Sequence, residues 1–363
     1  MRIRSNPQKH ILLINNIIYI IINNIYYFNI LKRLTKKMYE IEQINLKAEN
    51  VNILNKGKTI LLNNNNIIKR YEKSDGSDYK LVNTIIHNDT YGIIYLTMLS
   101  NEMILTSSRQ TIILYKKEEN SSYKIYQRIF NYNWAEIYKI KELDNTNFAV
   151  CGWYGFMIFN KHNNEYEISL EINEFTLQGH NHILDFMEIK RKKDEKNSFI
   201  LYGYEKAFII NDKKIINQIT LDVENKNPFG NNYICQFNDE LFILYGKKHI
   251  TLVNTYENKF KQIDFLDEDK AGKTNLFNID LCQYVYKYNS NSVILFSKTR
   301  LFIIQIINNE KIQVNLCIKL DKYYFPFNYI QEEKAIYFKN FKNKQINKLK
   351  IKKKYICYDM NNK

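Results

Sequence analysis

The sequence predicts an all-β fold, a seven-bladed β-propeller built from four-stranded antiparallel blades. The first observation is a strand–turn–strand phrase that recurs seven times, at steps of 42 to 52 residues. Propeller blades repeat at roughly 40–45 residues, so the longer steps indicate inserted loops. The first strands of the seven copies are centred on Ile60, Ile104, Ala149, Ile200, Phe242, Ile294 and Ile336. A β-sandwich stays open as the alternative all-β architecture.

The second observation is the order of strands around each copy, which Met103–Lys116 illustrates best. Its two apolar strands follow the β-rich run Gly92–Leu99 and precede the alternating run Tyr123–Ile129. The inner strands of a blade are covered on both faces, whereas the outer strand contacts water, so this order fits one blade. We expect blades at residues 48–87, 88–131, 132–174, 175–221, 222–265, 266–320 and 321–358.

The chain is expected to divide into three parts: a low-complexity apolar and basic segment at residues 1–38, the propeller at 39–358 and a short tail at 359–363. Ile11–Leu31 contains only Ile, Leu, Asn, Tyr and Phe, and it is long enough to span a bilayer. Its five asparagines weigh against insertion into hydrocarbon. A leader or disordered tail, a membrane anchor and a signal peptide all stay open for this segment.

The two ends of the propeller carry strand-like sequence that could close the ring. Tyr39–Leu46 alternates like an outer strand, and we expect it to complete the last blade, with Lys353–Tyr358 as the alternative. Closure matters because an open propeller leaves an unpaired sheet edge. The lysine-rich stretch Lys339–Lys354 is interpreted as strands of the last blade with their lysines pointing outward.

Across about residues 39–358 the phrase resembles that of the WD-repeat family, in degenerate form. Ser107–Tyr115 has the strand–turn–strand order, with Arg or Gln where the family has Asp and Tyr where it has Trp. Gly179-His180 stands before an inner strand, as the family's Gly-His pair does, and His87 occupies a comparable place. Because no Trp-Asp dipeptide occurs, the resemblance implies the fold but not the family's buried His–Ser–Asp–Trp network.

The net charge of +15 is concentrated near the two ends of the chain. Residues 1–37 hold seven basic residues and no acidic one, and residues 339–354 hold eight lysines and no acidic residue. The part between them is nearly neutral, so a binding surface for nucleic acid is not favoured.

The types and spacings of reactive residues favour a protein without an active site. The five cysteines are odd in number and widely spaced, which is typical of free buried thiols in a reducing compartment, and we expect a cytoplasmic protein. No Cys-x-x-Cys or His-x-x-His pair and no Gly-x-Ser-x-Gly elbow occurs. We therefore expect no catalytic, cofactor-binding or metal-binding residues.

In the resembled family, the turns within the repeated hairpins share one ring face with the loops that enter the blades, and this face commonly binds partners. The partner-binding candidates on these turns and loops are Arg109, Trp134, Trp153, Tyr154, Tyr204, Lys206, Lys247, Lys298 and Arg300. A basic rim with aromatic residues suits an acidic peptide, a phosphorylated segment or an anionic headgroup. The alternative is that lysine is simply common in the turns of a lysine-rich chain.

Three classes of function follow from these observations. The favoured one is a non-catalytic scaffold that mediates protein–protein interactions in a multiprotein complex. The alternative is a membrane-associated propeller that binds anionic lipid, or an acidic or phosphorylated ligand, through the basic rim, with residues 11–31 as the membrane contact. An enzyme built on the propeller is the third.

Overall fold

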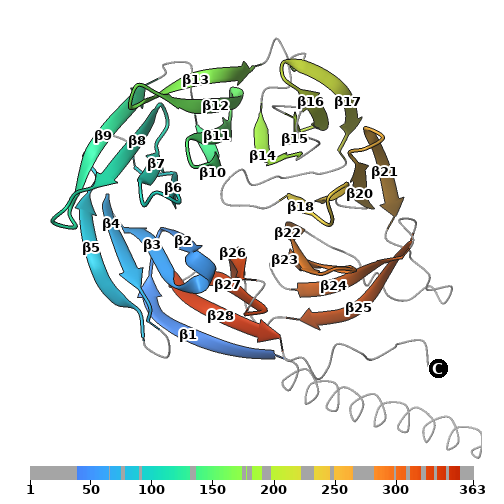
Figure 1. Ribbon diagram of the computed structural model, residues 1–363. Coiled ribbons are helices and arrows are strands. Elements are labelled where there is room, and N and C mark those ends of the chain that lie inside the picture. The colour runs from blue at the N-terminus through green and yellow to red at the C-terminus, as the bar shows by residue number, and fades with distance from the viewer. Residues whose placement is uncertain are drawn as a thin grey trace, which may run out of the picture.

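The computed structural model confirms an all-β, seven-bladed propeller in which seven four-stranded antiparallel sheets surround one central axis (Figure 1). The ring has no α-helix in the part of the chain that the structure describes, only one 3-10 turn, η1 (Asn55–Gly57). The structure describes residues 39–64, 66–74, 78–89, 92–130, 136–173, 177, 182–189, 198–221, 233–245, 249–264, 282–297, 300–307, 311–319, 324–330, 333–340 and 343–351.

Each blade is formed by four strands, and the seven sheets lie where the repeat predicts them. Blade 1 contains β2 (Asn50–Leu54), β3 (Thr59–Asn64), β4 (Ile67–Glu72) and β5 (Lys80–Ile86). Blade 2 contains β6 (Tyr95–Met98), β7 (Ile104–Ser107), β8 (Thr111–Lys117) and β9 (Tyr123–Phe130). Blade 3 contains β10 (Ile137–Asp144), β11 (Asn147–Gly152), β12 (Gly155–His162) and β13 (Glu165–Ile172).

The remaining blades continue the same order around the ring. Blade 4 contains β14 (Ile183–Glu188), β15 (Ser198–Gly203), β16 (Lys206–Asn211) and β17 (Lys214–Thr220). Blade 5 contains β18 (Ile234–Gln236), β19 (Leu241–Tyr245), β20 (His249–Asn254) and β21 (Lys259–Asp264). Blade 6 contains β22 (Cys282–Asn289), β23 (Ser292–Ser297), β24 (Arg300–Ile307) and β25 (Lys311–Lys319).

Blade 7 is assembled from both ends of the described chain. It contains β26 (Tyr324–Ile330), β27 (Ala335–Asn340), β28 (Gln345–Ile351) and, as its outer strand, β1 (Tyr39–Lys47). β1 runs antiparallel to β28 along the outside of the ring (Figure 1), with Tyr39 opposite Ile351. The expectation that the first strand completes the last blade is confirmed.

The burial of the strands follows the predicted pattern. Every residue of β15 is buried, whereas buried residues are absent from the outer strand β17, where exposed and half-buried side chains alternate. The apolar core lies between neighbouring blades: Phe148 and Phe159 of blade 3 pack with Leu105 and Leu114 of blade 2. Each sheet is therefore stabilised mainly by apolar contacts with the sheets beside it.

One expectation about the lysine-rich last blade is wrong. The Lys348 side chain on β28 does not point outward; it is buried and forms an ion pair with Glu333. Lys339 is half-buried and donates a hydrogen bond to the carbonyl oxygen of Glu49. Lys344 and Lys350 are exposed, as expected. The correction has a physical reason: the faces of an interior strand of a blade are covered by the neighbouring blades, so a lysine at a covered position such as Lys348 needs an acidic partner.

No helix among the described residues is long and apolar enough to cross a membrane. The segment Ile11–Leu31 lies outside those residues, so the alternatives for it stay predictions.

Candidate partner-binding site

The ring has two faces that differ in the connections they carry. We call the face with the turns between second and third strands, and with the loops that lead from one blade to the next, the turn face. The turn between β11 and β12 places Trp153 and Tyr154 on this face, and the turn between β15 and β16 places Tyr204 there. His182 precedes β14, the inner strand of blade 4, and lies on the same face.

His182 contacts Trp153 of blade 3 and Tyr204 of blade 4, and we call Trp153, His182 and Tyr204 the aromatic cluster. The ring centroids of Trp153 and His182 are 3.8 Å apart, with 45° between the planes. His182 also meets the Tyr204 ring edge-on at 6.1 Å. Trp153 is 40 % exposed and Tyr204 is 44 % exposed, so a large part of both rings contacts solvent. Tyr154, beside Trp153 in the turn, is exposed as well.

Backbone hydrogen bonds fix the aromatic cluster on the ring. The Trp153 amide donates to the carbonyl oxygen of Glu136 at 3.0 Å, which links the turn to the segment that enters β10. The Tyr204 amide donates to the carbonyl oxygen of His182 at 2.9 Å. Both turns are therefore attached to the inner strand of their own blade, and the exposed rings are held on a rigid base.

Two glycines allow the tight turn that presents Trp153 and Tyr154. Gly152 and Gly155 are opposite each other in the ladder, so the connection has only two residues. Gly155 has φ +109°, a conformation that favours glycine, and an added Cβ would lie 2.0 Å from the carbonyl oxygen of Ile172. At Gly152 an added Cβ would lie 2.1 Å from the carbonyl oxygen of Glu136.

The electrostatics of the aromatic cluster favour a neutral π surface. Burial lowers the pKa of His182, and the nearby Glu205 carboxylate acts in the opposite direction without restoring it. His182 is thus uncharged near pH 7, and its neutral ring can pack against Trp153 without a desolvated charge.

The predicted partner-binding residues have different places in the structure. Trp153 and Tyr204 both contact His182, and Tyr154 is exposed in the same turn as Trp153. Arg109 is exposed in the turn between β7 and β8, one blade away. Lys206 begins β16 and is half-buried. The backbone of Arg300 begins β24, but its side chain lies outside the description, as do Trp134, Lys247 and Lys298. The basic rim therefore stays a prediction.

Sequence reasoning missed His182, the residue that joins the two aromatic turns. The sequence does contain a signal for this residue. His182 immediately precedes an inner strand and lies two residues after the Gly179-His180 pair on which the WD-repeat resemblance partly rests. An inner strand begins on the turn face, so a ring at that position lies between the turns of two blades.

A second feature is a buried ionic network near the central axis, around Asp185 of β14. One carboxylate oxygen accepts from Nζ of Lys139 at 2.8 Å and from Nζ of Lys141 at 3.1 Å. The other accepts from the backbone amides of Tyr233 at 2.9 Å and Ile234 at 3.2 Å. The network connects blades 3, 4 and 5, and both oxygens are occupied by protein donors.

The pKa values agree with a structural role for this network. Burial would raise the pKa of Asp185, but the two lysines outweigh it and hold that pKa below its usual range. Burial lowers the pKa of Lys139 to about 8, although Asp185 opposes the shift. The carboxylate is thus ionised and fully bonded, which leaves it little capacity to act as a general base.

The described residues contain no group of three His, Cys, Asp or Glu side chains placed to hold a metal ion. Cys151 and Cys235 are free and buried, as the sequence predicts. Burial raises the pKa of both thiols, that of Cys235 to about 12, so neither is a reactive thiolate at neutral pH.

No protein-family model and no curated protein matches the sequence. Among solved structures, the β-propeller domain of Cps50 (Swd1) from Myceliophteria thermophila is similar with TM-score 0.59 and 8 % identity, covering 85 % of this chain and 99 % of that one. A chain of the mitotic checkpoint complex gives TM-score 0.60 and 8 % identity, over 86 % of this chain and 91 % of that one.

A lyase with a propeller fold is also similar. A catalytically inactive His-to-Ala variant of virginiamycin B lyase from Staphylococcus aureus, with quinupristin, gives TM-score 0.55 and 13 % identity. The match covers 86 % of this chain and all of the lyase chain. At these identities the similarities establish the propeller fold alone.

Proposed function

We propose that the chain is a non-catalytic propeller scaffold that binds another protein through the turn face of blades 3 and 4. The observation that carries the proposal is the aromatic cluster, in which half-exposed Trp153 and Tyr204 are held against His182 on a rigid base. Contiguous exposed apolar surface on a soluble protein often marks an interaction site, and tryptophan and tyrosine are enriched in such sites.

The physical basis is the energetics of protein interfaces. Tryptophan and tyrosine are enriched among residues whose truncation costs 2 kcal/mol or more of binding free energy, because they bury much area with few rotatable bonds. Trp153, Tyr154 and Tyr204 come from turns whose backbones are bonded to the inner strands. Little conformational entropy is lost when such rings are covered by a partner, which favours a stable complex.

Two further observations support the proposal. Cps50 (Swd1) and the mitotic checkpoint complex chain share the fold, and the second of these belongs to a complex by its own description. The central carboxylate of Asp185 is saturated by protein donors, so this carboxylate is not available as a general base. A reducing, cytoplasmic location remains part of the proposal.

The proposal is tested by affinity purification from the native organism with quantitative mass spectrometry. The tagged full chain is compared with a Trp153→Ala/Tyr204→Ala double variant and with Tyr256→Ala as the matched control. Tyr256 is 78 % exposed in the turn between β20 and β21, on the opposite face. We expect partners that the double variant recovers at least tenfold less and that the control recovers fully.

Two results would contradict the proposal. Equal partner recovery by the full chain and the double variant would exclude the aromatic cluster as the docking site. Turnover of quinupristin by the purified chain would contradict a non-catalytic role, because the similar lyase structure holds that compound.

A further inference from the structure

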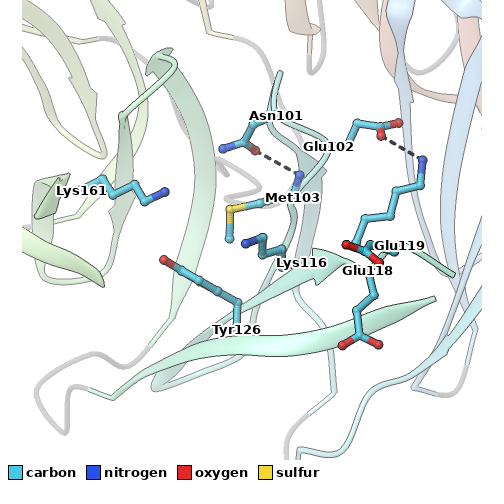
Figure 2. Close-up of a pocket in the computed structure, with 9 residues that line it drawn as sticks. Asn101, Glu102, Met103, Lys116, Glu118, Glu119, Tyr126 and Lys161 are labelled. Atoms are coloured by element: carbon cyan, nitrogen blue, oxygen red, sulfur yellow. Dashed lines mark hydrogen bonds and ion pairs between the residues drawn. The ribbon is translucent and has the colours of Figure 1, made fainter. Parts of the chain in front are cut away.

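A pocket of about 450 Å³ opens on the opposite face, between blades 2 and 3 (Figure 2). This face carries the turns between first and second strands and between third and fourth strands. The pocket is bounded by the turn that leads into β7, by the end of β8 and by the last residues of β12. Its volume is in the range that small-molecule and side-chain ligands occupy.

Two lysines face each other across this pocket. Lys116 shares a face of β8 with Leu114, and Lys161 shares a face of β12 with Phe159. Leu114 and Phe159 belong to the same core cluster between the two blades. The two lysines therefore lie at the surface, above the core contact between Leu114 and Phe159. Figure 2 shows both ammonium groups directed into the same pocket.

Both ammonium groups lie over one aromatic ring. Nζ of Lys116 is 5.7 Å from the centroid of Tyr126, and Nζ of Lys161 is 5.9 Å from it. Within the described part of the chain, neither ammonium group forms an ion pair with a carboxylate. Two positive charges thus lie over one ring at the mouth of the pocket. A bound anion would reduce the electrostatic repulsion between them.

The Tyr126 ring is held in place by the strand geometry. Leu114 pairs with Gln127 and Tyr115 pairs with Ile125, so Tyr126 is an extra residue in a β-bulge of β9. Its hydroxyl donates to the carbonyl oxygen of Asn164 in the neighbouring blade. The ring is thereby bound to both walls of the pocket before any ligand arrives.

The acidic residues that also line the pocket are mostly neutralised by other bases. Glu102 accepts from Arg70 at 2.8 Å and from Lys117 at 2.9 Å, and Glu118 is paired with Lys124 at 2.9 Å. Figure 2 shows Glu118 and the exposed Glu119 on the side of the pocket away from Lys161. The positive charge of the two lysines is therefore not cancelled at the Tyr126 side.

We propose that this pocket binds a phosphate monoester, with the phosphate between Lys116 and Lys161 and the group that carries it against Tyr126. A phosphate monoester near pH 7 carries between one and a half and two negative charges, which matches two ammonium groups. Its three outer oxygens can accept hydrogen bonds from both lysines at once. The site is separate from the aromatic cluster and gives the scaffold a second ligand on the other face.

The test is isothermal titration of the purified full chain with phenyl phosphate, with phenol and inorganic phosphate as partial probes. We expect one equivalent of phenyl phosphate to bind, more tightly than inorganic phosphate, and phenol not to bind. In a Lys116→Met/Lys161→Met variant the affinity should fall at least tenfold. Lys213→Met, in an exposed turn on the same ring face of blade 4, should bind as the unmodified chain does.

A further arm identifies the source of the phosphate. A phosphotyrosine heptapeptide that binds more tightly than phenyl phosphate would indicate a protein segment, and equal or weaker binding would indicate a free metabolite. Thermal denaturation of each variant checks that the fold is retained. The proposal is overturned if phenyl phosphate shows no saturable binding, or if the folded double variant binds it as tightly as the control does.

Discussion

The Nδ1 atom of His87 lies 2.8 Å from the hydroxyl oxygen of Tyr115, in the interior between blades 1 and 2. Beside this pair, Ser108 donates a hydrogen bond to the carboxylate of Asp89 at 2.8 Å. His87 and Asp89 both belong to the loop between β5 and β6, so the two hydrogen bonds tie that loop to β8 and to the end of β7.

Replacing Tyr115 by Phe should destabilise the protein by about 1–3 kcal/mol. The change keeps the ring but leaves His87 Nδ1 buried without a partner, and Nε2 of His87 already has none among the described residues. Urea denaturation followed by tryptophan fluorescence measures the loss. The control, Tyr256→Phe, removes an exposed hydroxyl and should change the unfolding free energy by less than about 0.5 kcal/mol.

Stability should fall as the pH drops below about 6.5. Burial lowers the pKa of His87, Arg128 lowers it further, and Asp89 only partly compensates, so the folded state takes up a proton at lower pH than the unfolded chain. The stabilisation is complete above the unfolded pKa and is lost as pH falls toward the folded one. His182 contributes in the same direction.

Urea midpoints at pH 8, 6.5 and 5 check this dependence. A His87→Gln variant should show a shallower decline between pH 6.5 and 5, while His162→Gln, a change at an exposed histidine of β12, should keep the original slope. Identical slopes for all three proteins would show that His87 is not responsible.

Removing the carboxylate of Asp185 should be far more harmful than removing Lys139. Asp185→Asn leaves the buried Lys139 and the half-buried Lys141 without an anion, and breaking a buried ion pair in this way costs about 3–5 kcal/mol. Lys139→Met leaves the pair with Lys141 intact and removes a charge that is costly to bury, so its cost should stay below about 2 kcal/mol. Chemical denaturation of both variants compares the two values, and a larger loss for Lys139→Met would reverse the assignment.

Gly155→Ala should disrupt the turn that carries the aromatic cluster. The positive φ of Gly155 and the carbonyl oxygen of Ile172 at 2.0 Å from an added Cβ both oppose the change. We expect lower thermal stability together with weaker partner recovery. Gly92→Ala is the matched control, because no heavy atom lies within 4 Å of its added Cβ. Equal effects of the two substitutions would mean that the turn geometry is not restrictive.

The fold could be predicted because each blade repeats its own signal. The inner apolar strands are covered on both faces and the outer strand contacts water, so each blade shows the same order of apolar and alternating strands. β1 could be assigned because it alternates like an outer strand but precedes the first complete blade. Local patterns of this kind depend on burial at each position, which hydrophobicity reports.

The polar contacts between blades could not be predicted in the same way. Lys139 and Asp185 are 46 residues apart, and Asp185 and Tyr233 are 48 apart, which is close to one repeat. The spacing of about one repeat can be read from the sequence. The sequence does not show, however, whether a lysine in an inner strand pairs with a buried carboxylate or contacts solvent. The same limit explains Lys348, whose partner Glu333 precedes the neighbouring strand. The contact of Trp153 with His182 depends on two separate turns, so neither sequence segment indicates it alone.

Residues 39 and 351 are opposite each other in the last sheet, and this has a consequence for synthesis. Among the described strands β1 is synthesised first and β28 last, so β1 cannot pair until more than three hundred further residues have been added. Throughout translation β1 is a solitary strand, and the growing arc of blades ends in an unsatisfied edge. Completion of the circle should therefore be the slow, post-translational event in folding.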